Sequence, residues 1–586
     1  MVAIAFVLAA ALTWRKWPDM LVDFGTQLYI PWRIVNGAVL YRDLFYFAGG
    51  PFSQYFNALL FKIFGVSFST IIAANLTLTA AALFVIFRRF YQATDAWTAT
   101  IMGLGIVFVF AFAEYTGIGN YSYISPYSHE AFHGLVLSIF AIALLCDWIG
   151  SGKIWRAIAA GFCTGLVFLT KPDIFAALVV AVIVAFVLFR LKWGLKKFAR
   201  PVMAFVIAGI VPSLFFFFYF LRVESARDSL RSVVFGWLPL LHGTVTKSPF
   251  YIWCTGLDKP SDHLREIFVY FIAVVVVVAV YAFVLRKTRK LKWMAQYAVL
   301  LVLIAPLLYW AIRFDWINCG WPLPLLCLLA CILIAWNYAN TETRLVFPLL
   351  WSVFGLALLA KLGLFPRIWH YGFVLAMPAF VSSIYLLFWL LPNLLERKFR
   401  VPSPQFRTIV GLILLVGFYS LFQGSQSIYA RKGLPVGEGG DRIYTYNLND
   451  VVYGNTSQAI CGALLWTVQY MPTNATFAAL PQGIMLNYLT RRVNPTPGMD
   501  WNPTMFTVFG QDNMTEAFEK NPPDYIFLVE WSSADFGVGY FGSSPDYGWK
   551  LMEWIDANYK PQVLFGSEPL RNGRFGIKIL KRATGS

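Results

Sequence analysis

The chain has 586 residues, of which 59% are hydrophobic and only 13% are charged, and its mean hydropathy is +0.62. Soluble domains are roughly 45–50% apolar, so this composition excludes a protein that is surrounded only by water. A net charge of +17 would suggest nucleic-acid binding in a soluble protein, but Lys and Arg residues beside apolar segments also orient membrane proteins. We therefore predict a membrane protein that contacts the lipid bilayer and has no nucleic-acid partner.

About thirteen apolar segments approach the roughly 20 residues that a membrane-spanning helix needs. In chain order, these segments are 1–13, 66–87, 97–113, 131–149, 155–170, 173–190, 201–221, 266–285, 294–312, 319–337, 345–362, 371–391 and 407–423. Segment 1–13 is short, and Arg15 and Lys16 follow it. We predict that it is a first anchor helix; the alternatives are a cleaved signal peptide and a start codon placed too far downstream.

The basic residues between these segments predict the orientation of the chain. Most of them fall in alternate connections, whereas the opposite short connections hold only Lys171, Arg313 and Arg367. Because short loops rich in Lys and Arg stay in the cytoplasm, the opposite set is predicted to face outward. That set comprises 14–65, 114–130, 171–172, 222–265, 313–318, 363–370 and everything after 423. We expect a multi-pass protein of a bacterial inner membrane, with its active site and C-terminal domain on the extracytoplasmic side.

The composition changes after Phe422, where Gly, Asn, Pro, Asp and Tyr become frequent and no apolar run is long enough to span. Strand-like runs then alternate with helix-like patterns. The strand-like runs are Thr476–Leu480, Tyr525–Val529, Gln562–Phe565 and Phe575–Leu580, and the helix-like ones are Ser457–Met471, Met514–Glu519 and Trp549–Asn558. We predict an all-α transmembrane domain over 1–429 and an extracytoplasmic α/β domain over 430–586.

The seven cysteines do not indicate a metal or redox site. There is no CxxC pair and no Cys/His spacing suited to zinc, so the cysteines inside apolar segments are interpreted as small core residues. Cys254 and Cys461 lie in segments predicted to be external. A disulfide between them is therefore an alternative to two free thiols.

The predicted first outer loop, 14–65, carries three acids next to the membrane surface: Asp19, Asp23 and Asp43. Its motifs are Pro18-Asp19-Met20-Leu21-Val22-Asp23-Phe24-Gly25, Leu40-Tyr41-Arg42-Asp43, Gly49-Gly50-Pro51 and Ala58-Leu59-Leu60-Phe61-Lys62-Ile63-Phe64-Gly65. Gly165-Leu166-Val167-Phe168-Leu169-Thr170-Lys171-Pro172-Asp173 follows later. In this order, the motifs resemble the C-type (GT-C) glycosyltransferase superfamily, in particular its protein O-mannosyltransferase-like and aminoarabinose-transferase-like branch.

The resemblance implies a membrane enzyme that moves a sugar from a polyprenyl-phosphate carrier to an acceptor outside the cell, which is a lipid, a glycan or a protein. It also implies that an acid of the first outer loop is the general base, and Asp23 matches that position. Family members commonly carry an Asp-Glu pair there, whereas Phe24 follows Asp23 in this chain. Asp19 or Asp43 could therefore share the role or hold it.

Elementary chemistry supports the same assignment. A carboxylate that takes the proton of an attacking hydroxyl accelerates the reaction by about 10²–10⁴. The departing phosphate needs positive charge nearby, and Lys171, Arg313 and Arg367 are the outward-facing cations at span ends that could supply it. We predict inversion at the anomeric carbon and no cofactor, because nothing in the sequence requires a metal.

The second outer loop and the segment before residue 371 supply further polar candidates. His129 and His133 are four residues apart, with Glu130 between them, which allows a metal site but lacks the full zinc-protease pattern. Contact with the acceptor or the sugar is the preferred interpretation, with Glu130 or Glu114 as a second acid, and capping of a helix by Ser128 is the plain alternative. The residues predicted to bind acceptor or sugar are Glu114, Tyr127, His129, His133, His370 and Tyr371.

Two further segments have patterns that suit either binding or packing. Segment 222–265 has charges at helix-like spacing and an aromatic run, which favours an amphipathic helix on the membrane surface or ordinary loop packing. Leu480-Pro481-Gln482-Gly483 and Asn487-Tyr488-Leu489-Thr490-Arg491-Arg492 follow a predicted strand. Loops in this position often bind ligands, but these residues suit docking onto the membrane domain equally well.

Two other functions fit the same composition. A transporter or flippase of lipid-linked substrates would have polar breaks near the middle of its spans, whereas the acids here gather in predicted outer loops. A polymerase or ligase of lipid-linked glycans would use similar chemistry on a related fold. The sequence contains no nucleotide-binding motif and no serine-hydrolase motif, so it does not support nucleotide-driven chemistry or serine hydrolysis.

Overall fold

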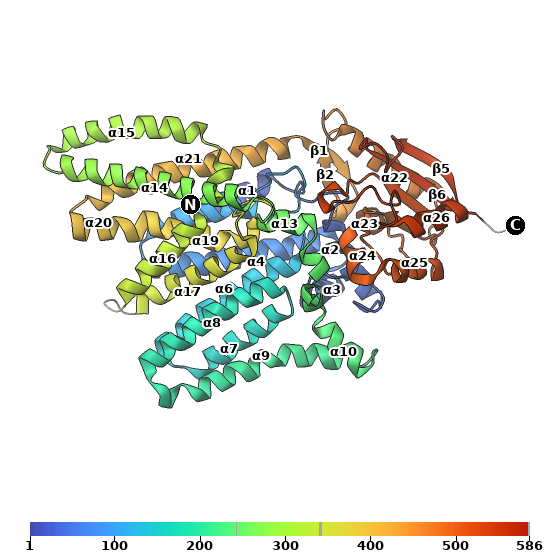
Figure 1. Cartoon of the computed structure of the whole chain (residues 1–586), viewed down its shortest axis with the longest axis horizontal. Coiled ribbons are helices and arrows are strands. Elements are labelled where there is room, and N and C mark those ends of the chain that lie inside the picture. Colours follow the sequence, from blue (N-terminus) through green and yellow to red (C-terminus); the bar gives the residue numbers. More distant parts are fainter. Residues whose placement is uncertain (242, 339–342, 584–586) are drawn as a thin grey trace.

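The computed structural model describes residues 1–241, 243–338 and 343–583 (Figure 1). Long helices form a bundle, and a small domain with a β-sheet, built from the C-terminal residues, lies at one end of it. By length and apolar composition, eight helical segments among the described residues can cross a membrane. They are Phe68–Ala93, His129–Ser151, Pro172–Trp193, Leu195–Phe220, Pro249–Thr288, Trp316–Asn337, Gly372–Phe399 and Ser403–Ala430. The predicted helical membrane fold with a C-terminal sheet domain is confirmed.

Each segment that the sequence predicted to span contains helix in the structure. The main bundle helices are α1 (Val2–Leu12), α4 (Phe68–Ala93), α5 (Ala96–Ile106), α6 (His129–Ser151), α7 (Ile154–Phe168), α8 (Pro172–Trp193), α9 (Ala199–Phe220), α14 (Pro260–Thr288), α15 (Trp293–Arg313), α16 (Leu323–Tyr338), α17 (Val346–Leu359), α19 (Met377–Tyr385), α20 (Leu391–Phe399) and α21 (Ser403–Ala430). Several of them, including α1 and α7, are shorter than the roughly 20 residues of a full span. The number of crossings therefore stays a prediction.

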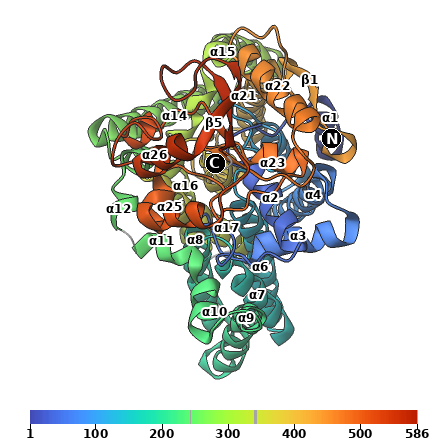
Figure 2. The same cartoon turned by 90° about the vertical axis from the view of Figure 1, so that its right-hand side faces the viewer.

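Glycines set the closest helix packing in the bundle. A Cβ at Gly161 of α7 would lie 2.1 Å from the Phe205 carbonyl oxygen of α9, and one at Gly165 would lie 2.1 Å from the Gly209 carbonyl oxygen. Small residues four apart let two helix backbones approach in this way, as they do in many membrane proteins. Helices α7 and α9 consequently form a pair that projects from the rest of the bundle (Figures 1 and 2).

The first predicted outer loop, 14–65, is largely helical. Helix α2 (Phe24–Val35) begins directly after Asp23, and α3 (Phe52–Phe64) packs against α2. Nine consecutive residues of α2, Phe24–Trp32, are buried, so this helix lies inside the molecule rather than on its surface. The later outer segment, 222–265, folds as α10 (Ala226–Val233), α11 (Leu238–Leu241), α12 (Gly243–Thr246) and α13 (Pro249–Thr255) before α14 begins.

The C-terminal domain contains two sheets. Strands β1 (Lys432–Val436) and β2 (Ile443–Tyr446) form an antiparallel pair. Strands β3 (Phe477–Leu480), β4 (Tyr525–Val529), β5 (Tyr559–Gly566) and β6 (Gly576–Arg582) form a sheet in the order β3-β4-β6-β5, in which only β3 and β4 are parallel. Every residue of β4 is buried, as expected for a continuous apolar strand covered on both faces. The domain's helices are α22 (Gly454–Tyr470), α23 (Ile484–Thr490), α24 (Pro503–Phe509), α25 (Gln511–Lys520) and α26 (Trp549–Asn558).

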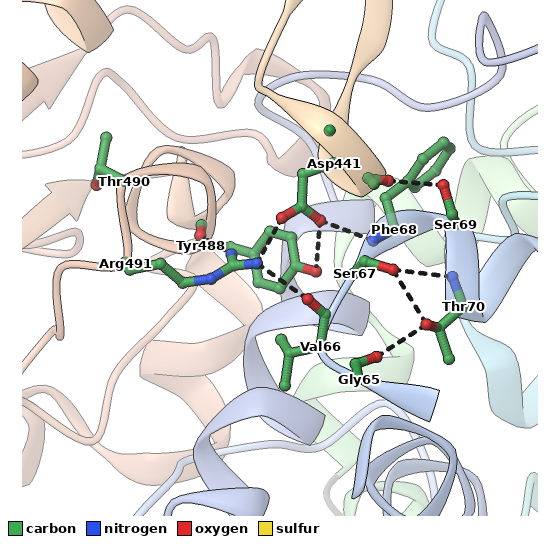
Figure 3. Close-up of polar contacts among 12 residues, drawn as sticks. Gly65, Val66, Ser67, Phe68, Ser69, Thr70, Asp441, Tyr488, Thr490 and Arg491 are labelled. Atoms are coloured by element: carbon green, nitrogen blue, oxygen red, sulfur yellow. Dashed lines mark hydrogen bonds and ion pairs between the residues drawn. The ribbon is translucent and has the colours of Figure 1, made fainter. Parts of the chain in front are cut away.

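A carboxylate of the C-terminal domain fixes that domain to the bundle (Figure 3). Asp441, between β1 and β2, accepts hydrogen bonds from the Phe68 backbone N–H at the start of α4 and from the Tyr488 hydroxyl of α23. Its second oxygen pairs with Arg491, 2.5 Å away. One carboxylate thus joins a bundle helix to α23, and Tyr488 and Arg491 have the docking role that was one of the two alternatives for their segment.

Helix α23 in turn packs against α2, and Figure 2 shows the two helices next to each other. A Cβ at Gly25 of α2 would lie only 2.5 Å from the Met485 backbone nitrogen of α23. A second buried ion pair, 2.9 Å long, joins Lys432 of β1 to Glu114. The C-terminal domain is therefore anchored at α2, at the start of α4 and at Glu114.

The disulfide considered between Cys254 and Cys461 does not form, because both are free thiols. Cys254 is buried in α13, while Cys461 lies in α22 of the C-terminal domain. Their location in separate parts of the fold explains why shared exposure to the outside is not enough to pair them.

Substituting Gly25→Ala should loosen the C-terminal domain. The added methyl group must displace the Met485 backbone, and overpacking of this kind typically costs about 1–3 kcal/mol. Hydrogen exchange of the α23 amides in the full-length protein should therefore accelerate. Gly424→Ala is the matched control, since a Cβ at Gly424 meets nothing within 4 Å. Equal exchange of α23 in both variants and the wild type would show that this close contact does not hold the domain.

Candidate active site

A cavity of about 470 Å³ lies where the start of α2, the loops before α6 and α8, α13, the segment before α18 (Gly372–Leu375) and the C-terminal domain meet. Its wall combines opposite charges with aromatic rings, an arrangement typical of ligand sites. The charged residues in the wall are Asp23, Asp173, Asp500, Asp535, Lys171 and Lys361, and the aromatic ones include Tyr121, Tyr127, Phe250, Tyr251, Trp253, Trp369, Tyr371, Trp531 and Phe536.

Asp23 has an unusual backbone conformation. Its φ of 55° and ψ of −59°, together with a 2.6 Å hydrogen bond from the Phe24 N–H to the Val22 carbonyl oxygen, define a classic γ-turn, which is rare and strained. Aspartate before a helix usually accepts a hydrogen bond from the first turn, but the Asp23 side chain makes no such cap. Strain of about 1–3 kcal/mol persists mostly at functional sites, and here it accompanies a carboxyl group left free at the cavity wall.

The pKa of Asp23 is raised to about 7, first by burial and then by the negative charges of Asp500 and Asp19, while Lys171 acts in the opposite direction. The pKa of Asp500 is also raised to about 7, mainly by burial, although hydrogen bonds from Asn502 oppose the shift. A base is most effective when its pKa lies near the working pH. Asp23 is therefore suited to accept a proton at neutral pH.

Two lysines place positive charge in the same cavity. Lys171, just before α8, donates a 2.6 Å hydrogen bond to the Tyr127 hydroxyl, and burial lowers its pKa. Lys361 lies in a 3₁₀ turn after α17, and its amino group makes no hydrogen bond or ion pair with the residues that the structure describes. Sequence reasoning missed Lys361 because it falls inside the apolar segment 345–362.

Five of the predicted site residues line this cavity: Asp23, Tyr127, Lys171, His370 and Tyr371. His370 adopts a positive φ of 52°, and its Nδ1 accepts a hydrogen bond from Arg367. Arg367 itself is only 1% exposed and also donates to the Cys254 and Phe365 carbonyl oxygens. The Arg367 guanidinium therefore contacts His370 from behind, and its predicted contact with the phosphate stays a prediction.

Glu130 and His129 form part of a buried polar layer beneath the cavity. The Glu130 carboxyl is fully buried and accepts hydrogen bonds from Tyr46, Gln54 and Ser128. His129 contacts Gln27 through Nδ1 and Asn75 through Nε2. Because Gln27 and Tyr46 line the cavity wall, Glu130 and His129 support that wall from behind.

Four predicted residues lie elsewhere. Asp43 pairs with Arg42 at a distance of 2.8 Å on a partly exposed surface. Glu114 forms a buried ion pair with Lys432. Arg313 is exposed at the end of α15 and stacks on Tyr309. His133 is enclosed by the rings of Phe52 and Phe56. None of these four residues lines the cavity, and their predicted roles stay predictions.

The two histidines of α6 lie in different surroundings. Their ring centroids are 5.4 Å apart, but His129 is bound by amide side chains and His133 is packed against rings. Across residues 1–241, 243–338 and 343–583, no group of three or more His, Cys, Asp or Glu side chains is arranged to hold a metal ion.

Comparison with known proteins gives structural matches only. No protein-family model matches the chain, and no curated protein matches it in sequence. The crystal structure of ArnT from Cupriavidus metallidurans bound to undecaprenyl phosphate is similar over 99% of this chain and 97% of that chain, with a TM-score of 0.52 and 11% identity. The Archaeoglobus fulgidus oligosaccharyltransferase in complex with Zn and sulfate matches over 90% of this chain and 67% of that chain, with a TM-score of 0.49 and 13% identity.

The match to ArnT extends over both the bundle and the C-terminal domain. It shows that the chain shares the fold of this ArnT structure, as expected from the resemblance of the outer-loop motifs to the GT-C superfamily. The particular branch of that superfamily stays a prediction.

Substituting Asp500→Asn should lower the pKa of Asp23 below about 7. The substitution removes a negative charge that disfavours ionisation of Asp23. In difference infrared spectra, the carboxyl stretching band of the wild type should contain two components that titrate near neutral pH, one from Asp23 and one from Asp500. In Asp500→Asn only the Asp23 component should remain, and it should titrate at a lower pH. Asp512→Asn, at an exposed acid of the same domain, should leave both components unchanged. If the Asp500→Asn spectra titrate like the wild type, the two carboxyl groups do not interact.

Proposed function

We propose that this protein is a membrane glycosyltransferase that moves a sugar from a polyprenyl-phosphate donor to an acceptor hydroxyl on the extracytoplasmic side. The observation that carries the proposal is the cavity in which the uncapped Asp23 carboxyl and the Lys171 and Lys361 amino groups occur together. The GT-C fold supports it, since ArnT, a structure with the same fold, was crystallised with undecaprenyl phosphate.

The proposed reaction is a single displacement. Asp23 accepts the proton of the acceptor hydroxyl while that oxygen forms a bond to the anomeric carbon. The bond from that carbon to the phosphate oxygen breaks, and polyprenyl phosphate leaves as an anion. One direct displacement inverts the configuration of the anomeric carbon.

Lys171 and Lys361 stabilise the phosphate as its charge develops. An ammonium group about 4 Å from a phosphate oxygen is worth roughly 4 kcal/mol at an effective dielectric constant of about 20. The Tyr127 hydroxyl fixes the position of the Lys171 amino group, so little reorganisation is needed during the reaction.

Asp23→Asn should abolish transfer, because an amide of the same shape cannot accept the proton. We expect a rate loss of about 10²–10⁴, with binding of the donor retained. The assay uses the full-length protein in lipid nanodiscs, a panel of radiolabelled polyprenyl-phosphate sugars and a cell-envelope fraction as acceptor. Asp43→Asn is the control and should keep near-normal transfer, since Asp43 pairs with Arg42 outside the cavity. Transfer that continues unchanged in Asp23→Asn would remove this residue from the role of base.

Lys171→Gln and Lys361→Gln should each weaken binding of polyprenyl phosphate. Losing a charge-assisted contact typically costs about 1.5–3 kcal/mol, which corresponds to a decrease in affinity of roughly 10- to 100-fold. Binding of radiolabelled undecaprenyl phosphate to the protein in nanodiscs measures the effect. Lys153→Gln, at an exposed position between α6 and α7, should bind like the wild type. Unaltered binding in both cavity variants would place the phosphate elsewhere.

A further inference from the structure

The C-terminal domain supplies one wall of the cavity opposite the bundle. Gln482 follows β3, and Asp500 and Asn502 precede α24. The backbone N–H of Trp501 donates a 2.8 Å hydrogen bond to the Pro481 carbonyl oxygen, so the two segments are held side by side. None of these residues takes part in the displacement described above.

Gln482 carries a buried oxygen that lacks a partner. Its side chain is only 5% exposed, and it lies near Asp500, where it opposes the rise in the pKa of that carboxyl. Its Oε1 accepts no hydrogen bond from any residue that the structure describes. A buried acceptor left unsatisfied is costly, and this one belongs to a side chain that lines a cavity. The missing donor is therefore expected to come from a ligand.

Asp500 adds further acceptor oxygens beside Gln482. It receives hydrogen bonds from the Asn502 backbone N–H, at 3.1 Å, and from the Asn502 amide, at 2.7 Å, and it forms no ion pair with a cation among the described residues. This part of the wall thus presents oxygen atoms that can accept hydrogen bonds from a ligand. A group with several hydroxyls matches that demand, because each hydroxyl donates one hydrogen bond.

The surroundings of these oxygens favour a sugar ring over a simple alcohol. Trp531 and Phe536 of the C-terminal domain line the same wall, and Phe536 stacks on Phe250 of α13 with ring centroids 4.8 Å apart. Aromatic faces offer rigid apolar area for the carbon–hydrogen face of a pyranose. A second cavity, of about 380 Å³, shares the wall residues Val245, Thr504 and Phe536 with the first, which leaves room beyond a single sugar unit.

We propose that Gln482 and Asp500 bind hydroxyl groups of a carbohydrate acceptor, which would extend into the adjoining cavity along α24. The identification of this carbohydrate as the acceptor rests on the proposed function, whereas the binding of a carbohydrate does not. The C-terminal domain then completes the active site, because it holds the acceptor hydroxyl on the side of the cavity opposite the bundle.

Saturation-transfer NMR with simple glycosides tests this proposal. The full-length protein is placed in lipid nanodiscs free of glycoside detergents and is mixed with the methyl glycosides of mannose, glucose, galactose or arabinose, or with ethanolamine as an amine probe. We expect at least one glycoside to receive saturation from the wild type. Gln482→Leu should bind that glycoside about fivefold more weakly, the effect of one lost hydrogen bond, and Asp500→Asn should weaken it as well.

Gln562→Leu is the matched control, because Gln562 is exposed on β5 of the same domain, and it should bind like the wild type. Hydrogen exchange of β3 verifies that Gln482→Leu is folded. Binding of ethanolamine alone, binding of no glycoside, or equal binding by folded Gln482→Leu and the wild type would each overturn the proposal.

The outcomes also separate this proposal from the proposed function. If Gln482→Leu binds glycosides normally while Asp23→Asn stops transfer, the carbohydrate site is wrong and the glycosyltransferase stands. If glycosides bind through Gln482 but no polyprenyl-phosphate sugar is consumed, the carbohydrate site stands and the transferase is wrong.

Discussion

The close approach of two backbones, at Gly25 of α2 and Met485 of α23, is the constraint on which the arrangement of the site depends. Helix α2 begins at Asp23, and α23 begins shortly after Gln482. Contact between these helices therefore brings the first outer loop and the C-terminal domain to one cavity, although they are far apart in the sequence. The hydrogen bond from the Phe68 backbone N–H to Asp441 and the buried Lys432–Glu114 pair keep the two parts in register.

Burial then gives the cavity its chemistry. Removing carboxyl groups from water raises the pKa values of Asp23 and Asp500 to about 7, and their mutual repulsion adds to the shift at Asp23. The Lys171 amino group partly offsets the rise in the pKa of Asp23. It does not pair with Asp23 directly, because it donates its hydrogen bond to the Tyr127 hydroxyl. The γ-turn before α2 frees Asp23 from helix capping. A carboxyl group with a pKa of about 7 and a lysine amino group thus line one cavity without forming an ion pair.

The sequence predicted the features that depend on local pattern. The apolar segments, the strand Tyr525–Val529 and the outer-loop motif around Asp23 all follow from periodicity, composition or resemblance. The β1–β2 pair was missed, because Gly433 and Pro435 interrupt the alternation typical of strands. Arg367 was assigned to the phosphate because its charge was visible, whereas its burial among aromatic rings was not. Lys361 and Asp500 needed the tertiary fold, since no local pattern marks either residue.

The most direct test is a cryo-electron microscopy structure of the full-length protein in nanodiscs with undecaprenyl phosphate bound. The account predicts phosphate density within hydrogen-bonding distance of the Lys171 and Lys361 amino groups, in the cavity that Asp23 and Asp500 line. Phosphate density bound at another place, with this cavity empty, would contradict it.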